Sequence, residues 1–214
     1  MELENMNILV GKITTILEQN LLNDFKKINT STIPDNLFGT NLLEDIKYNN
    51  PNYDEECLNE MLNQFDLDKS ILNRRFNNIS KSEYKKMCII IAILDSKPIL
   101  LLENPTVGLD VKSKKNLIKM LKRERKRDRI IIITSTDSEF LFKAVNYVIY
   151  KDNTRYVIND NKYNFFSNKR LLKAYDLVEP NIIEFYSQVR KKTKIRLINR
   201  DNINDLIKEI YRNA

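Results

Sequence analysis

The sequence predicts an α/β protein built on a parallel sheet. Two short apolar runs, residues 99–102 and 130–133, lack polar alternation, which is typical of strands buried on both faces of such a sheet. A segment with helical periodicity at residues 111–127 lies between them, as a crossover between parallel strands requires. The chain has 214 residues, 42% of them hydrophobic and 30% charged, so it can hold one substantial core.

The first 35 residues are weakly patterned. Gly11-Lys12-Ile13-Thr14 predicts the start of a short strand. Residues 16–27 predict a helix with Leu17, Leu21 and Phe25 on one face. Pro34 ends regular structure there, and residues 41–45 predict one short helical turn.

Two helices are predicted between this segment and the first apolar strand. Asp54 can cap a helix over residues 55–65. Ser80 and Glu83 have the spacing of a capping box, and a buried apolar stripe follows them. The stripe consists of Met87, Ile90, Ile91 and Leu94.

The sequence after the second apolar strand, residues 130–133, predicts a hairpin followed by a helical region. Residues 145–150 and 155–158 are expected to be two edge strands, with a turn at Asp152-Asn153. Residues 163–214 are more polar and predict helices, so we expect a boundary near residue 160.

Two absences restrict the chemistry. The chain has no histidine, which excludes histidine metal ligands, histidine general bases and Ser-His-Asp triads. Its three glycines are Gly11, Gly39 and Gly108. A phosphate-binding loop of the Gly-x-x-x-x-Gly-Lys-Ser/Thr type needs two glycines five positions apart, so the sequence contains no such loop.

Composition also indicates a cytoplasmic protein. The longest apolar run, residues 88–94, is far shorter than the roughly 18 residues of a membrane span. The first five residues are acidic and lack the apolar core of a signal peptide. Cys57 and Cys88 are far apart and are expected to be reduced thiols.

The net charge of +7 is concentrated in one segment. Residues 112–129 carry ten Lys or Arg against Glu124 and Asp128. A basic helix of this kind could bind nucleic acid or an anionic lipid surface. A solvated helix face is the favoured interpretation, because no aromatic residue is interleaved to stack on bases.

Five ordered motifs resemble ATP-binding cassette (ABC) ATPases, and most closely the energy-coupling factor (ECF) type. Residues 98–110, Pro-Ile-Leu-Leu-Leu-Glu-Asn-Pro-Thr-Val-Gly-Leu-Asp, are similar to the Walker B and D-loop region. Residues 34–46 resemble the Q-loop region, and residues 79–83 stand where the signature Leu-Ser-Gly-Gly-Gln belongs. Ser135-Thr136-Asp137 stands at the switch-histidine loop, and residues 171–212 resemble the C-terminal extension.

The resemblance implies a partial P-loop NTPase-like sheet that covers residues 30–214. We expect a truncated ATPase-like domain at residues 1–160, with a helical subdomain at about 40–95, and a helical extension at 161–214. The phosphate loop is missing. Gly11-Lys12-Ile13-Thr14 is either its remnant or, preferably, the strand that follows the first nucleotide-binding helix.

The departures from the family pattern argue against autonomous ATP hydrolysis. Glu103 replaces the aspartate that orients magnesium, and Asn104 replaces the catalytic glutamate. An amide accepts no proton near neutral pH, so general-base catalysis is lost. Thr136 replaces the switch histidine, and no glutamine stands near Thr32 in the Q-loop segment. We therefore expect no active catalytic residue and no metal site, with Glu103 as the nearest to a metal ligand.

A few motif residues could still contribute to a partner's nucleotide site. The signature-like residues are Ser80, Lys81, Ser82 and Glu83, and the D-loop aspartate is Asp110. Lys81 could offer a positive charge to a phosphate or could be a solvent-facing lysine beside a helix cap. Asp110 is explained equally well as a cap.

The leading hypothesis is a degenerate ABC subunit that pairs with an intact ATPase or docks on a transmembrane component of an ECF-type transporter. The alternatives are a contributor of signature and D-loop groups to a composite site, a non-functional relic, and a nucleic-acid binder. We expect no cofactor for the chain alone, ATP and Mg²⁺ only in a composite site, and a cytoplasmic location at the inner face of the membrane.

Overall fold

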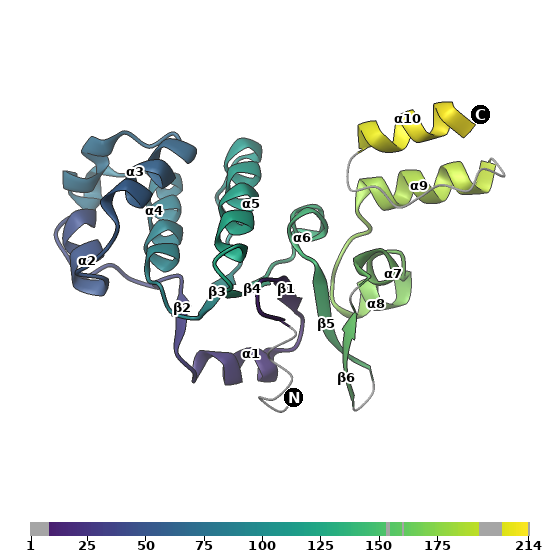
Figure 1. Cartoon of the computed structure of the whole chain (residues 1–214), viewed down its shortest axis with the longest axis horizontal. Coiled ribbons are helices and arrows are strands. Elements are labelled where there is room, and N and C mark those ends of the chain that lie inside the picture. Colours follow the sequence, from purple (N-terminus) through teal and green to yellow (C-terminus); the bar gives the residue numbers. More distant parts are fainter. Residues whose placement is uncertain (1–8, 153–154, 160, 193–202, 214) are drawn as a thin grey trace.

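A computed structural model describes residues 9–152, 155–159, 161–192 and 203–213. A six-stranded sheet with the order β2-β3-β4-β1-β5-β6 runs through it, which confirms the predicted fold class (Figure 1). The strands are β1 Ile13–Ile16, β2 Thr30–Thr32, β3 Ile99–Glu103, β4 Ile130–Thr134, β5 Tyr147–Asp152 and β6 Arg155–Asn159. All neighbours are parallel except β5 and β6.

Helices cover both faces of the sheet. Helix α1, Gln19–Lys26, lies on one face, whereas α4, Lys81–Leu94, α5, Val111–Arg125, and α6, Ser138–Ala144, lie on the other (Figure 1). The remaining α-helices are α2 Leu42–Asn49, α3 Glu55–Gln64, α7 Lys162–Phe166, α8 Lys169–Ala174, α9 Asn181–Lys192 and α10 Ile203–Asn213. Two 3₁₀ helices, η2 Lys69–Asn73 and η3 Phe76–Asn78, precede α4.

Successive residues of the apolar strands enter two separate cores. In β3, Leu100 and Leu102 join the core beneath α4 and α5, whereas Ile99 and Leu101 join the core with Phe25 of α1. Both sets are buried because each face of the sheet is covered by helices. This arrangement explains why the predicted strands have no polar alternation.

Strand β1 lies in the centre of the sheet. It pairs with β4 through Thr14 and Ile132, and with β5 through Thr15 and Val148. The strand starts two residues later than Gly11-Lys12-Ile13-Thr14 suggests. It precedes helix α1, so the preferred expectation that this segment is the strand after the first nucleotide-binding helix is wrong. The N-terminal segment therefore completes the middle of the sheet, with three strands on one side of β1 and two on the other.

The prediction of two edge strands is correct for β6 and wrong for β5. Strand β5 is internal, because it pairs with β1 on one side and with β6 on the other. Its neighbour β1 is only four residues long, which made this pairing hard to foresee. In the predicted turn, Asn153 lies outside the described residues.

Helix caps account for several predicted boundaries. Asp54 accepts a hydrogen bond from the Cys57 backbone at the start of α3. Ser80 and Glu83 form the expected capping box of α4. The single turn expected at residues 41–45 is instead the eight-residue helix α2, for which Asn41 is the cap. Strand β2, helix α6 and both 3₁₀ helices are not among the predicted elements, and α7 begins one residue before the region predicted to be helical.

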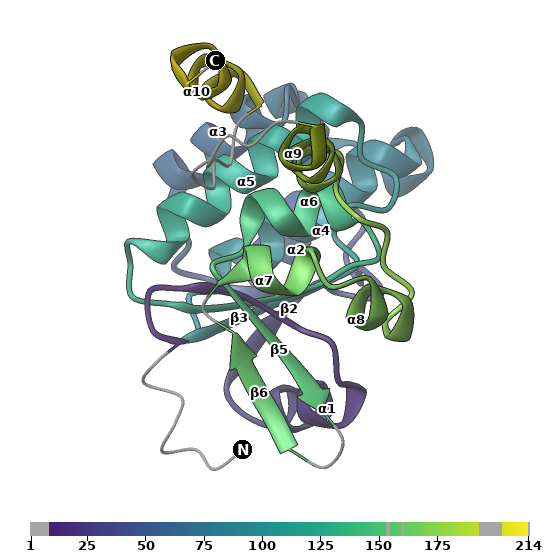
Figure 2. The ribbon, with the colours of Figure 1, turned by 90° about the vertical axis from the view of Figure 1, so that its right-hand side faces the viewer.

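The last helices pack around the end of the sheet. Helices α7 and α8 lie beside β5 and β6, with α9 beyond α6 (Figure 2). Aromatic rings form much of this contact. The ring centroids of Phe142 in α6 and Phe166 lie 5.5 Å apart, and those of Tyr150 in β5 and Phe165 lie 5.4 Å apart. Among the described residues, no helix combines the length and the apolar character needed to cross a bilayer.

A buried ion pair joins four elements at the amino-terminal edge of the sheet. The side chains of Arg129 and Glu124 are 7% and 1% exposed, and their charged groups lie 3.1 Å apart. Arg129 also donates hydrogen bonds to Ser31 of β2 and to backbone carbonyls that include those of Ile93 and Asp95. The guanidinium is therefore part of the core, although the sequence suggested a solvated basic segment.

We predict that Arg129→Ala strongly destabilises the fold. The substitution leaves the Glu124 carboxylate buried without its main partner, and breaking such a pair costs about 3–5 kcal/mol. Urea unfolding followed by circular dichroism measures the loss. Lys27→Ala is the control, because it removes an exposed pair with Asp24 and should cost less than about 1 kcal/mol. Similar losses for the two variants would contradict this prediction.

Candidate functional site

The sheet topology creates a switch point, which is the position of the ligand crevice in open α/β sheets, at the carboxyl ends of β1 and β4. The chain leaves β1 through α1 on one face of the sheet, and it leaves β4 through α6 on the other (Figure 1). Ligands of open α/β sheets bind where neighbouring connections diverge in this way. The residues at the crevice are Leu17 and Glu18 after β1, and Ser135, Thr136 and Asp137 after β4.

The connection from β1 to α1 is short and contains no glycine. Only Leu17 and Glu18 separate the strand from the helix, and the Leu17 backbone donates to the carbonyl of Ile149 at 3.0 Å. A phosphate loop would need a longer, glycine-rich turn whose N–H groups face the ligand. This turn is instead held against β5.

Glu18 precedes the first residue of α1, and its carboxylate is bound by a distant tyrosine. The Tyr175 hydroxyl donates to Glu18 Oε1 at 2.8 Å and accepts from the Lys151 backbone at 2.9 Å. Burial, together with the Glu18 carboxylate, raises the pKa of Tyr175. The positive end of the helix dipole at this N-terminus favours an anion, and the Glu18 carboxylate already occupies that place. The carboxylate would repel a second anion.

The Walker B position carries a carboxylate that already has a cation. Glu103 ends β3, and its Oε1 lies 2.6 Å from Lys26 Nζ of α1, with both side chains partly exposed. The next residue, Asn104, is exposed and has a positive φ of 43°, a conformation that asparagine tolerates better than most residues. Its backbone N–H donates to the Thr134 carbonyl at 2.8 Å.

A polar network connects the turns that follow β3 and β4. The Thr106 and Ser135 hydroxyls lie 3.0 Å apart, and the Asp137 backbone donates to Ser135 Oγ. Asp137 caps α6 and forms a 2.6 Å ion pair with Lys114 of α5. Burial alone would raise the pKa of Asp137, but Lys114 and the cap hydrogen bond lower it overall. Thr136, at the switch position, is exposed.

The signature-like residues form a separate cluster at the start of α4. The Ser80 hydroxyl and backbone lower the pKa of Glu83, whose carboxylate lies 3.7 Å from Arg74. Lys81 is exposed and Ser82 is half-buried. Asp110 caps α5 by accepting from the Ser113 backbone at 2.7 Å. The capping roles expected for Ser80 and Asp110 are therefore present.

The Q-loop-like segment is folded onto the start of α2. The buried Asp45 carboxylate accepts from the backbones of Phe38 and Gly39 at 2.8 and 3.0 Å. A side chain at Gly39 would meet the Glu44 Cβ at 2.8 Å, so this turn needs glycine. Phe38 itself points outward and is 84% exposed.

The sequence predicts that Glu103, Asn104 and Thr136 lie at the same end of the sheet. The structure confirms this, because Glu103 at the end of β3 pairs with Thr134 at the end of β4. Glu18, Lys26 and Tyr175 were not among the predicted site residues. Glu18 and Tyr175 are 157 positions apart, so their contact left no local pattern. The capping role of Asp137 could be predicted from the sequence, because an aspartate just after a predicted strand is a common helix cap.

No protein-family model matches the sequence. The chain is 30% identical over 135 residues to MG303 of Mycoplasma genitalium, named as an ABC transporter ATP-binding protein, which covers 62% of this chain and 37% of that protein. It is 19% identical over 134 residues to the energy-coupling factor transporter ATP-binding protein EcfA2 of Mycoplasmoides gallisepticum, covering 63% and 42%. The chain thus spans about a third to a half of the length of the curated relatives it matches.

Solved structures show the same fold at low sequence identity. CbiO1 of Clostridium perfringens, part of the ABC transporter complex cbiONQ, has a TM-score of 0.59 at 18% identity, over 83% of this chain and 88% of that one. An ATP-binding subunit of an ABC transporter has a TM-score of 0.59 at 14% identity, over 85% and 89%. The chain is therefore a homologue of ABC transporter ATP-binding proteins and has the fold of their ATPase cassette.

Proposed function

We propose that this chain is a degenerate ABC-transporter subunit that does not hydrolyse ATP alone. It serves as a pairing or docking module of an ECF-type transporter, at the inner face of the cell membrane. Its partners are an intact ABC ATPase and a transmembrane component. Nucleic acid is not among the expected partners.

The observation that carries the proposal is the turn between β1 and α1. This turn stands at the crevice where the fold binds nucleotide phosphates, yet it offers two residues, no glycine and the Glu18 carboxylate. Tyr175 and Ile149 hold the turn in place through hydrogen bonds. A triphosphate approaching this helix N-terminus meets a negative charge instead of a ring of N–H donors.

The residues around the crevice also do not fit a magnesium ion held by this chain. Glu103 is paired with Lys26, and the neighbouring Asn104 is uncharged. Mg²⁺ usually binds one or two carboxylates together with substrate phosphates and water. With the phosphate-binding loop replaced, neither a phosphate nor a second carboxylate completes such a site at Asn104.

Exposed apolar side chains at two places support a role in assembly. Val107 and Val111, in the D-loop-like turn and at the start of α5, are 65% and 70% exposed. Phe38 and Tyr48, in the Q-loop-like segment and on α2, are 84% and 80% exposed. Exposed apolar side chains of this kind are available for protein-protein contacts. We assign the valines to the ATPase partner and the aromatics to the transmembrane component.

A composite ATP site is the second candidate, favoured by the intact caps at Ser80 and Asp110. These caps fix the N-termini of α4 and α5, the helices that carry the signature-like and D-loop-like residues. In that case Lys81→Glu lowers the ATPase rate of the assembled complex, whereas a pure docking module leaves the rate unchanged.

We predict that Mg-ATP does not stabilise the isolated chain. A ligand at one hundred times its dissociation constant adds about 2.7 kcal/mol to the free energy of unfolding. For a chain of this size such a gain raises the melting temperature by roughly 5–10 °C. Differential scanning fluorimetry with millimolar Mg-ATP should show no such rise.

We further expect Asn104→Glu to leave turnover at background. The substitution returns a potential general base, but the phosphate loop remains absent, so ATP is not positioned for attack. A phosphate-release assay measures turnover, with an intact ABC ATPase as the positive control. Hydrolysis by Asn104→Glu would show that a phosphate site exists elsewhere in the chain.

The two exposed patches should be separable by mutation. Phe38→Ser with Tyr48→Ser should abolish co-purification with a transmembrane transport component, because it removes the apolar contact surface. Val107→Asp with Val111→Asp should abolish pairing with an ABC ATPase. Affinity purification in detergent followed by mass spectrometry identifies the captured proteins.

Val178→Asp is the matched control for both variants. Val178 is 74% exposed but lies outside both patches, so its replacement should leave both partners bound. Unchanged circular dichroism spectra must accompany each loss. Retention of both partners by both double variants would place the docking surfaces elsewhere.

A further inference from the structure

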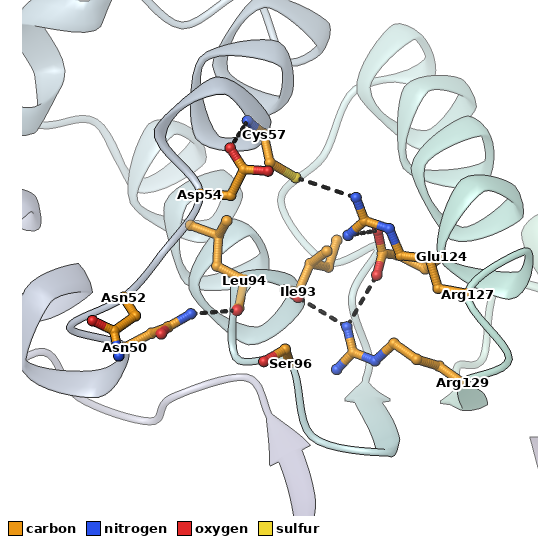
Figure 3. Close-up of a pocket in the computed structure, with 10 residues that line it drawn as sticks. All are labelled: Asn50, Asn52, Asp54, Cys57, Ile93, Leu94, Ser96, Glu124, Arg127 and Arg129. Atoms are coloured by element: carbon orange, nitrogen blue, oxygen red, sulfur yellow. Dashed lines mark hydrogen bonds and ion pairs between the residues drawn. The ribbon is translucent and has the colours of Figure 1, made fainter.

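The basic segment at residues 112–129 contains two kinds of basic side chain. Six of the ten have polar partners within the fold, and Figure 3 shows two of these, Arg127 and Arg129, directed toward the Glu124 carboxylate. The other pairs are Lys112 with Asp66, Lys114 with Asp137, Arg123 with Glu60, and Arg125 with Asn146. These six side chains therefore help to hold the fold together.

The remaining four basic residues form a lysine ridge on the exposed face of α5. The ridge consists of Lys115, Lys119, Lys122 and Lys126, and none of them has an ion pair or hydrogen bond with another described residue. Their spacing of four, three and four positions places them on one side of the helix, over about 16 Å. Like charges at this spacing repel one another, so the ridge favours an anionic partner.

A groove of about 360 Å³ lies beside the ridge, between α5 and α6. Its apolar lining comes from Val111 and Ile118 of α5 and from the buried Phe140 of α6. Lys115 lines the groove and also belongs to the ridge. An apolar side chain placed in this α5–α6 groove would therefore lie next to the lysines.

The acidic residues of the groove are already paired. Asp137 lies 2.6 Å from Lys114, and Glu139 lies 3.3 Å from Lys143 and accepts a hydrogen bond from the Asn181 backbone. The groove and the ridge together contain six lysines against these two carboxylates, a net charge of +4. The combined surface is thus apolar in its groove and positive along one side.

We propose that the lysine ridge and the α5–α6 groove form a docking surface for an acidic amphipathic helix of a partner protein. Such a helix, laid along α5, would place apolar side chains in the groove and glutamate or aspartate side chains against the ridge. Acidic residues at helical spacing on the partner match lysines that recur every three or four positions. This inference goes beyond the docking role proposed above, because it uses a surface distant from Phe38 and Tyr48 and names the chemistry of its occupant.

Two other anionic partners match fewer features of this surface. Single-stranded nucleic acid stacks its bases on aromatic side chains, and residues 111–127 contain none. A helix that lies on a lipid surface carries leucine or aromatic side chains opposite its lysines, ready to enter the bilayer, whereas the opposite face of α5 is buried in the core. An acidic amphipathic helix uses both the charge of the ridge and the apolar groove.

Fluorescence anisotropy with the full chain tests the proposal. The probe is a labelled synthetic helix of about 18 residues, with leucines along one face and glutamates on both flanks. A scrambled peptide of the same composition and a peptide with glutamine in place of glutamate are the comparison probes. We expect the amphipathic acidic helix to bind at least about tenfold more tightly than either comparison peptide.

Variants of the chain test the ridge and the groove separately. Lys119→Gln with Lys122→Gln should weaken binding of the amphipathic acidic helix about fivefold, because two ridge charges are removed. Lys47→Gln with Lys192→Gln is the matched control, since it removes two charges from exposed residues outside the surface and should leave the affinity unchanged. Val111→Ser should weaken binding about threefold, and it spares the core because Val111 is 70% exposed.

Three results would overturn the proposal. Equal affinity for the amphipathic and the scrambled peptide would show that charge alone attracts the probe. Unchanged affinity of the ridge variant or of Val111→Ser would exclude the ridge or the groove from the contact. Tighter binding to duplex DNA or to phosphatidylglycerol vesicles than to the amphipathic acidic helix would assign the lysines to a different class of partner.

Discussion

The fold depends on the insertion of β1 between β4 and β5. This four-residue strand hydrogen-bonds on both sides, and the backbone of Ile13 is held further by both the backbone and the side chain of Asn146. Its side chains divide between the two cores, with Ile13 on one face and Ile16 on the other. Without β1 the sheet would separate into a three-stranded and a two-stranded part, so both cores depend on this segment.

The same strand determines what stands at the crevice. In open α/β sheets, residues that follow a central strand lie at the edge where ligands bind. In this chain those residues are Leu17 and Glu18. Their partners come from within the chain: Tyr175 binds Glu18, and Lys26 binds Glu103. The charged groups at this edge are thus matched by one another, which is consistent with a protein whose role is assembly rather than hydrolysis.

Local patterns predicted much of the fold, and long-range contacts supplied the rest. The apolar strands and the caps at Asp54, Ser80 and Asp110 were predictable because each depends on neighbouring residues. Strand β2 was not, since Thr-Ser-Thr carries no apolar signal and is recruited by pairing with β3. At the site, the partners of Glu18 and Glu103 could not be foreseen, because side-chain contacts across the fold leave no trace in local sequence.

The central position of β1 has a consequence for synthesis on the ribosome. The strand ends at Ile16, whereas its partners β4 and β5 end at Thr134 and Asp152. At 5–20 residues per second, β1 therefore waits roughly 7–27 s before both neighbours exist. During that interval a strand with two isoleucines and unpaired backbone groups is open to wrong partners. The nascent chain is thus most exposed to aggregation before β5 is made, and slower translation would lengthen that period.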